Sequence, residues 1–135
     1  MNNIELIKEI LEDEIRGDVE SALKKMHPNY SMTWVYKKKD GTLFPRTTSE
    51  NLKRELEDVY VIKDRSYKIK HILAQDNVVI AELIESYSDQ RKTYRTPMVI
   101  VWEFEGGLIK KGRHYCDPQL SYLDLSEEQI EKGIF

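Results

Sequence analysis

The chain has 135 residues, of which 33% are charged and 40% hydrophobic, and its formal net charge is -3. This length predicts a single domain, residues 1–135, that buries a core of its own. The acidic balance argues against a nucleic-acid partner, which would require a basic surface.

The number of cysteines and the N-terminal segment exclude further classes of protein. The single cysteine excludes an internal disulfide, and the sequence contains neither a zinc-type spacing nor a cofactor motif. The N-terminal segment is acidic from Glu5 onward and has no long apolar run, so we expect neither a signal peptide nor a membrane span. We therefore expect a cytoplasmic protein without a metal, a cofactor or a membrane partner.

The first part of the chain predicts two helices. Apolar residues recur at helical spacing over residues 4–15, and Gly17 ends that helix. Asp18 is well placed to cap a second, short helix. We expect this second helix to run to Met26, where the His-Pro-Asn sequence of residues 27–29 breaks it.

A strand and a third helix follow. Residues 30–36 are rich in aromatic and β-branched side chains, which is typical of a strand. The segment 37–48 predicts a loop, and its lysine run before Asp40 and Gly41 indicates a solvated loop tip. Ser49 can cap a third helix over residues 50–60.

The second part of the chain reads as a long antiparallel meander. Four strands are expected at residues 67–75, 78–87, 92–105 and 110–123, and the tail after residue 126 predicts a final helical turn. Helices followed by such a meander predict the α+β class. Strands of ten or more residues exceed the usual length of about five or six, so the sheet must coil. A coiled sheet around helices encloses a cone with an open mouth, which is a natural pocket.

The last hairpin carries the titratable residues. Adjacent glycines, Gly106 and Gly107, tolerate the positive φ values of a tight turn. Period-two geometry then divides the following strand into two rows. One row holds Gly112, His114 and Cys116, and the other holds Arg113, Tyr115 and Asp117.

This order of elements resembles a known superfamily. The residues that carry the resemblance are the His-Pro-Asn-Tyr strand entry (27–30), the Gly-Gly-Leu-Ile hairpin (106–109) and the Arg-His-Tyr-Cys-Asp strand end (113–117). Together with the two helices before and the one after the first strand, they resemble the nuclear-transport-factor-2-like (NTF2-like) superfamily, in its polyketide-cyclase (SnoaL-like) branch, over residues 4–124.

The resemblance implies a fold and a range of functions. The fold is α+β, a cone-shaped curved antiparallel sheet wrapped around three N-terminal helices. The superfamily holds cyclases, ketosteroid isomerases, dehydratases and epoxide hydrolases, and also members with no known activity. The fold therefore does not settle the function.

The resemblance also implies candidate catalytic residues. In several of these enzymes an acidic residue just before the tyrosine of the last strand faces the pocket and transfers protons. Here that position is His114, and histidine can do the same work near neutral pH. The alternative is a neutral, structural histidine bonded to a backbone carbonyl or a tyrosine. By the same comparison Glu85 rather than Glu82 faces the pocket, either as a second polar group or as a rim carboxylate.

Other candidates would form the pocket wall. Methionine and aromatic stripes usually belong to a core, but in a cone the core face continues into the pocket. The candidate ligand-binding residues are Tyr30, Met32, Trp34, Ile100, Trp102 and Cys116. Cys116 is expected to be a small buried hydrophobe rather than a nucleophile. Asp117 is a weaker candidate that could pair with Arg113, and the remaining histidines, His27 and His71, are expected to be structural or exposed.

Two classes of function remain open. The first is binding of a small, mostly apolar molecule, with isomerase, cyclase or dehydratase chemistry carried by His114. The second is a non-catalytic ligand-binding or interaction module. Val99 and Val101 lie opposite Ile100 and Trp102, so this strand is apolar on both faces. A strand of this kind is usually covered on both sides, which predicts a homodimer through the outer sheet face.

Overall fold

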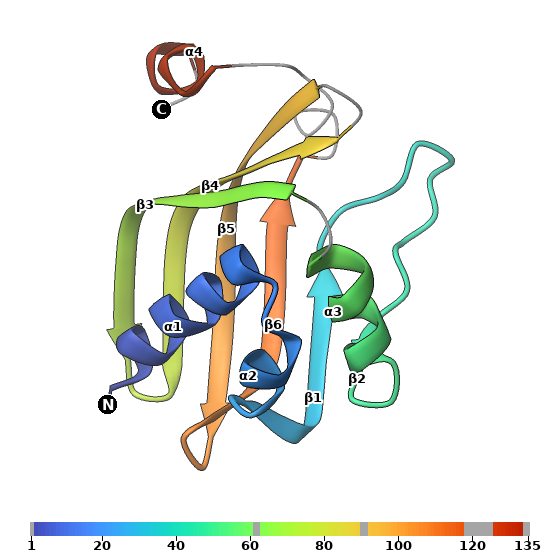
Figure 1. Cartoon of the computed structure of the whole chain (residues 1–135), viewed down its shortest axis with the longest axis vertical. Coiled ribbons are helices and arrows are strands. Elements are labelled where there is room, and N and C mark those ends of the chain that lie inside the picture. Colours follow the sequence, from blue (N-terminus) through green and yellow to red (C-terminus); the bar gives the residue numbers. More distant parts are fainter. Residues whose placement is uncertain (1, 61–62, 90–91, 118–125, 134–135) are drawn as a thin grey trace.

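The computed structural model describes residues 2–60, 63–89, 92–117 and 126–133 (Figure 1). Its helices are α1 (Asn3–Arg16), α2 (Val19–Leu23), α3 (Leu52–Tyr60) and α4 (Glu127–Gly133). Its strands are β1 (Met26–Trp34), β2 (Thr47–Thr48), β3 (Lys63–Gln75), β4 (Val78–Asp89), β5 (Lys92–Glu105) and β6 (Leu108–Cys116).

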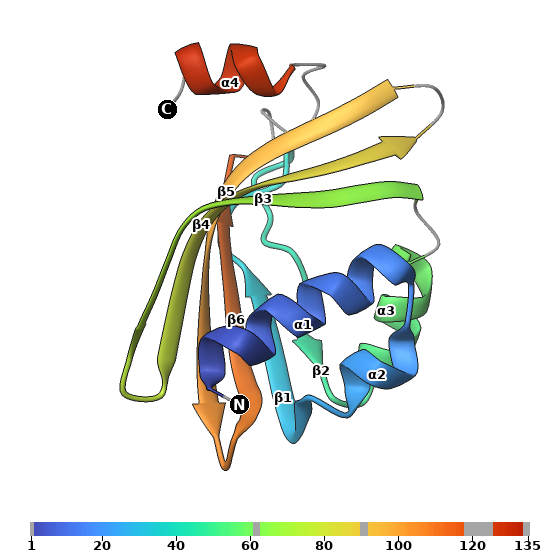
Figure 2. The ribbon, with the colours of Figure 1, turned by 60° about the vertical axis from the view of Figure 1, so that its left-hand side comes forward.

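The strands form one strongly curved sheet in the order β2-β1-β6-β5-β4-β3. Only β1 and β6 run parallel, so the sheet is mixed rather than wholly antiparallel. Figure 2 shows α1, α2 and α3 in the concavity of this sheet, while α4 lies on the opposite side of β3 from α1. The expected α+β fold, a curved sheet around three N-terminal helices, is confirmed.

Local signals set both ends of α1, and its end at Gly17 is the expected one. The Asn2 side chain accepts a hydrogen bond from the backbone N–H of Glu5 (2.8 Å), and the Glu5 carboxylate accepts one from Asn2 (3.2 Å). This reciprocal pair is a capping box. Gly17 ends the helix at φ 72°, a left-handed conformation that glycine adopts without strain. Asp18 caps α2 by accepting from Ser21 N–H at 3.1 Å.

The second helix is shorter than expected. It ends at Leu23 rather than at Met26, because Met26 already pairs with Ile109 of β6. The His-Pro-Asn sequence therefore belongs to a strand and does not precede one. Pro28 is tolerated there because it falls within a register shift between Met26 and Ser31, where a missing N–H costs no regular ladder bond.

Other helix and strand boundaries also differ from those expected from the sequence. β5 and the 76–77 turn match the sequence expectation. β1 spans Met26–Trp34 rather than residues 30–36, and α3 begins at Leu52 rather than at residue 50. β3 begins at Lys63 rather than at residue 67, and β6 spans Leu108–Cys116, whereas residues 110–123 were expected. β3 is longer because its charged first residues remain paired with β4, which itself extends to Asp89. The end of the last predicted strand, residues 118–123, lies outside the described residues.

The C-terminal helix covers part of the outer sheet face. Ile130 is fully buried, and Glu131 forms an ion pair with Lys68 of β3. Lys68 lies opposite Ile84 in the sheet register, and Ile84 lies opposite Pro97. Ile84 and Ile130 are both buried, but neither belongs to the main core cluster. Within the described residues, no helix has both the length and the hydrophobicity needed to cross a membrane.

The side chain of Tyr30 packs closely against β6 at Gly112. A Cβ atom at this position would lie 3.2 Å from the Tyr30 hydroxyl oxygen and 3.6 Å from Met32 Cγ. We expect Gly112→Val to lower the free energy of unfolding by about 1–3 kcal/mol, because buried overpacking forces neighbours to move. Urea unfolding measures this change.

The matched control is Gly133→Ala, since a Cβ there meets nothing within 4 Å. It should change the free energy of unfolding by less than about 0.5 kcal/mol. Equal stability of the two variants would show that Tyr30 does not approach β6 in this way.

Candidate functional site

The register of the last two strands places His114 on the inner face. It lies opposite Ile100 in β5, and Gly112 lies opposite the buried Trp102. Cys116 lies opposite Met98 on the same face. The row that sequence periodicity grouped together is therefore the row that faces the helices.

Two connected hollows lie between this face and the helices. The main cavity has a volume of about 260 Å³, and a smaller space of about 40 Å³, the inner cavity, lies beside it. Both are lined by Glu14, Met26, Tyr30, Tyr67, Glu85 and His114. Met32 and Trp34 add to the wall of the main cavity, and Ile100 and Trp102 add to that of the inner cavity.

His114 lines both hollows, and one of its ring nitrogens is unpartnered. Its ring lies 4.5 Å from that of Trp34, centroid to centroid. Its Nδ1 is buried and has no hydrogen-bond partner among the described residues. Burial lowers the pKa of His114 from its ordinary 6.5 to about 4, so the imidazole is neutral at pH 7.

A chain of four polar side chains lines the main cavity. Arg65 of β3 forms an ion pair with Glu85 of β4, with Nη1 3.2 Å from Oε1, and their side chains are only 4% and 14% exposed. The same Nη1 lies 3.5 Å from the Tyr67 hydroxyl, which donates a hydrogen bond to Glu14 of α1. Burial, then the carboxylates of Glu14 and Glu85, raise the pKa of Tyr67 well above 10. The phenol therefore stays protonated and remains a donor.

Sequence reasoning found only one member of this chain, Glu85. Glu14 carried a signal, because it follows the buried residues Ile10 and Leu11 by four and three positions and so shares their helix face. Arg65 and Tyr67 alternate onto the inner face of β3, but Arg65 lies before the predicted start of that strand. Their grouping depends on contacts between α1, β3 and β4 that no local pattern contains.

The remaining candidates have ordinary environments. Cys116 packs against the core, and burial raises the pKa of its thiol to about 11, as a buried hydrophobe would show. Arg113 donates a hydrogen bond to Glu103 on the outer face. His27 lies 2.9 Å from Glu105.

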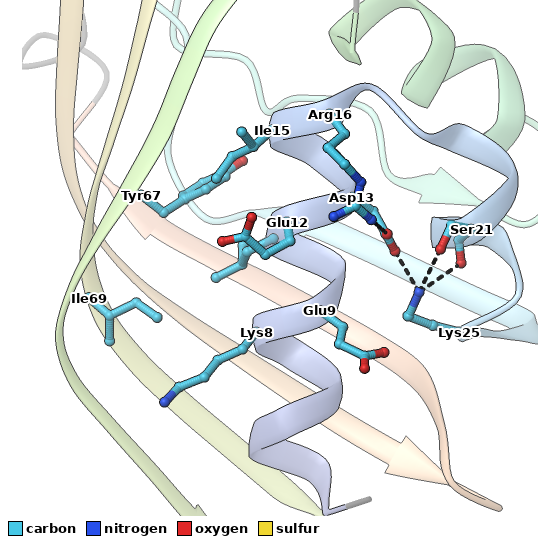
Figure 3. Close-up of a pocket in the computed structure, with 11 residues that line it drawn as sticks. Lys8, Glu9, Glu12, Asp13, Ile15, Arg16, Ser21, Lys25, Tyr67 and Ile69 are labelled. Carbon is cyan, nitrogen blue, oxygen red and sulfur yellow. Dashed lines mark hydrogen bonds and ion pairs between the residues drawn. The ribbon is translucent and has the colours of Figure 1, made fainter.

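A separate hollow lies along the outer side of α1. This α1–β3 groove has a volume of about 560 Å³ and is lined by residues of α1, α2 and β3 and by Lys25 (Figure 3). In it the buried Asp13 carboxylate accepts from Arg16 and Lys25, both at 2.6 Å. Lys25 also donates to the Ser21 hydroxyl at 2.8 Å. These contacts tie α1 to α2.

Comparison with known proteins identifies the fold. No protein-family model matches the chain, and no curated protein matches it. Solved structures do match. A candidate isomerase from Bacillus subtilis has a TM-score of 0.74 and 19% identity, covering 89% of this chain and 92% of that one. An NTF2-like protein of unknown function from Cytophaga hutchinsonii has a TM-score of 0.67 and 18% identity, covering 88% and 93%.

A third match shares the same fold. It is a candidate polyketide cyclase from Xanthomonas campestris, with a TM-score of 0.65 and 18% identity, covering 86% of this chain and 90% of that one. Identities of this size show a shared fold. The expected NTF2-like fold is thereby confirmed.

The low pKa of His114 predicts a specific pH dependence of stability. In the unfolded chain His114 binds a proton below about pH 6.5, whereas in the folded chain it stays neutral until about pH 4. The unfolded state therefore binds more protons in this window, and stability falls as the pH falls through it. We expect His114 to cost about 2 kcal/mol of unfolding free energy between pH 7 and pH 5.

Urea unfolding at both pH values measures this loss. His114→Gln should lack this share of the loss, because glutamine does not titrate. His71→Gln is the matched control, because His71 is exposed, and it should retain the full loss. A His114→Gln variant with the wild-type pH dependence would contradict a buried, neutral imidazole.

Proposed function

We propose that this NTF2-like fold binds a small, mostly apolar molecule in its main and inner cavities. It would act on that molecule as an isomerase, cyclase or dehydratase, with His114 as the proton-transfer group. The observation that carries the proposal is the His114 imidazole, which lines both cavities and has no hydrogen-bond partner for Nδ1 among the described residues. Structural neighbours described as a candidate isomerase and a candidate polyketide cyclase support it.

The chemistry follows from the desolvated site. A neutral imidazole accepts a proton from a carbon acid or a hydroxyl group held against it. Burial weakens His114 as a base in the empty cavity. An oxyanion that forms on the substrate in this space would attract the resulting imidazolium and offset that penalty. The base therefore gains strength only as the reaction proceeds.

The other walls would bind and orient the substrate. Glu85 is the proposed second polar group, and its ion pair with Arg65 presents an acceptor and a donor to a substrate hydroxyl or carbonyl. Apolar and aromatic side chains would pack on the rest of the molecule. These are Tyr30, Met32, Trp34, Ile100 and Trp102.

Proton exchange on a simple carbon acid tests the catalytic part. We expect the protein to accelerate exchange of the α-protons of cyclohexanone for deuterium in D₂O, followed by proton NMR. His114→Gln should lose about 100-fold of this rate, which is the usual contribution of a positioned base. His71→Gln should retain the rate, since that side chain lies away from the cavities. An unchanged rate in His114→Gln would exclude His114 as the base.

A non-catalytic role as a dimeric module is favoured by a different surface. Ile80, Val99 and Tyr115 lie on the outer face of three adjacent strands and are 36–42% exposed in the single chain. The same face carries both signs of charge, including the Glu103–Arg113 pair. A face with apolar patches and both charges can pair with its own copy about a two-fold axis. We therefore propose a homodimer that forms through the part of this face that α4 leaves open.

Light scattering tests the proposed homodimer. The wild-type chain should show twice its chain mass of 16.0 kDa at micromolar concentration. Val99→Glu should reduce the mass to that of one chain, because it buries a charge in the interface. Leu43→Glu, at an exposed loop position, is the control and should stay dimeric. A wild-type mass of 16.0 kDa would contradict the proposal.

A cytoplasmic location is part of the same proposal. It rests on the one cysteine, Cys116, which is free and therefore suits a reducing compartment. The net charge of -3 supports the proposal that the partner is a small molecule rather than a nucleic acid.

A further inference from the structure

Only a thin partition separates the α1–β3 groove from the cavities. Leu11 of α1 and Tyr67 of β3 line both the groove and the inner cavity. Tyr67 also lines the main cavity, so one aromatic ring faces all three spaces. Leu11 is part of the buried core, whereas Tyr67 stands on β3, at the edge of the sheet.

The Tyr67 ring is held across this partition by polar contacts at its tip. Its hydroxyl donates to Glu14, and Arg65 lies beside it. Glu14 and Arg65 both line the main cavity, so the ring is fastened from the cavity side. Rotation of the ring away from Glu14 would break this one donated bond and join the groove to the cavities.

The sizes of the spaces favour such a connection. The main cavity, at about 260 Å³, falls below the range of about 300–1,000 Å³ that is usual for ligand pockets. The groove has about 560 Å³, which brings the joined space well inside that range. A ligand longer than the cavity would then have room for one end on each side of Tyr67.

The groove side has its own chemistry. Figure 3 shows Lys8 and Glu12 extending from α1 toward β3, on either side of the space in front of Ile69. Neither side chain has an ion-pair partner within the described ranges, whereas Arg16 and Lys25 both pair with Asp13. Glu9 also lines the groove, but its side chain points away from Ile69 (Figure 3). Lys8 and Glu12 therefore place one cation and one carboxylate beside Ile69, which suits a head group that carries both charges.

We propose that the α1–β3 groove is the outer half of an elongated ligand site, closed from the cavities by Tyr67. The ligand is a linear amphipathic molecule with a zwitterionic head between Lys8 and Glu12. Its apolar tail passes Tyr67 and lies against Ile100 and Trp102. This inference rests on the proposed function, because it requires cavities that accept a ligand.

Intrinsic fluorescence can follow entry of a tail, because both tryptophans of the chain line the cavities. The probes are butyl and decyl dimethylammonio-propanesulfonates, used below micelle-forming concentrations. Each methylene that enters an apolar cavity adds about fourfold in affinity. The decyl probe should therefore bind at least about tenfold more tightly than the butyl probe. Equal affinities would overturn the proposal.

Variants test the head-group site and the Tyr67 partition separately. Lys8→Ala with Glu12→Ala should weaken decyl-probe binding about tenfold, and Lys53→Ala with Glu57→Ala, exposed on α3, should leave it unchanged. Tyr67→Phe keeps the ring but removes the bond to Glu14, so the decyl probe should associate about tenfold faster. Wild-type values in both the groove variant and Tyr67→Phe would overturn the proposal.

Cyclohexanone distinguishes the two possible failures. This probe is small enough for the main cavity alone. If it leaves the tryptophan fluorescence of the wild-type chain unchanged, the cavities take no ligand, and both the proposed function and the elongated site fail. If it binds while the decyl probe gains nothing over the butyl probe, only the passage past Tyr67 is wrong.

Discussion

The interior of this protein is organised around the chain of contacts from Glu85 through Arg65 and Tyr67 to Glu14. Three of these four side chains carry a charge in their usual ionised forms, and buried charges are tolerated only when paired and hydrogen-bonded. The chain links β4, β3 and α1, so the helix is fixed to the sheet by polar contacts at this place. A close-packed apolar core cannot form where these groups meet, and a hollow remains.

The position of His114 at this hollow determines its protonation state. Its ring is largely buried, yet among the described residues its Nδ1 lacks the carboxylate or carbonyl partner that usually holds a structural histidine. The result is a neutral base at one wall and a protonated phenol, Tyr67, at another. Groups with opposite proton preferences around one cavity are what proton transfer on a neutral substrate requires. Tyr67 joins this wall to the α1–β3 groove, so the same contact that supports the cavity also limits its size.

The sequence predicted the parts of this arrangement that depend on local pattern. The glycine pair after β5 and the period-two alternation of β6 are local, and they grouped His114 with Gly112 and Cys116; the superfamily resemblance then predicted that this row faces inward. The amphipathic spacing of α1 and its glycine stop are local too. The Tyr67–Glu14 contact joins residues 53 positions apart, and the place of α4 against Lys68 depends on similar long-range packing. Arg65 was missed because charged residues at the start of β3 hide its alternation.

The central claim is that His114 is a neutral base facing a cavity that accepts a ligand. Nitrogen-15 NMR of the histidine side chains, recorded through a pH titration with and without cyclohexanone, tests this most directly. The His114 imidazole should remain neutral down to about pH 5. Its unprotonated nitrogen should shift when cyclohexanone is added. An imidazole that titrates near pH 6.5 and ignores cyclohexanone would contradict the claim.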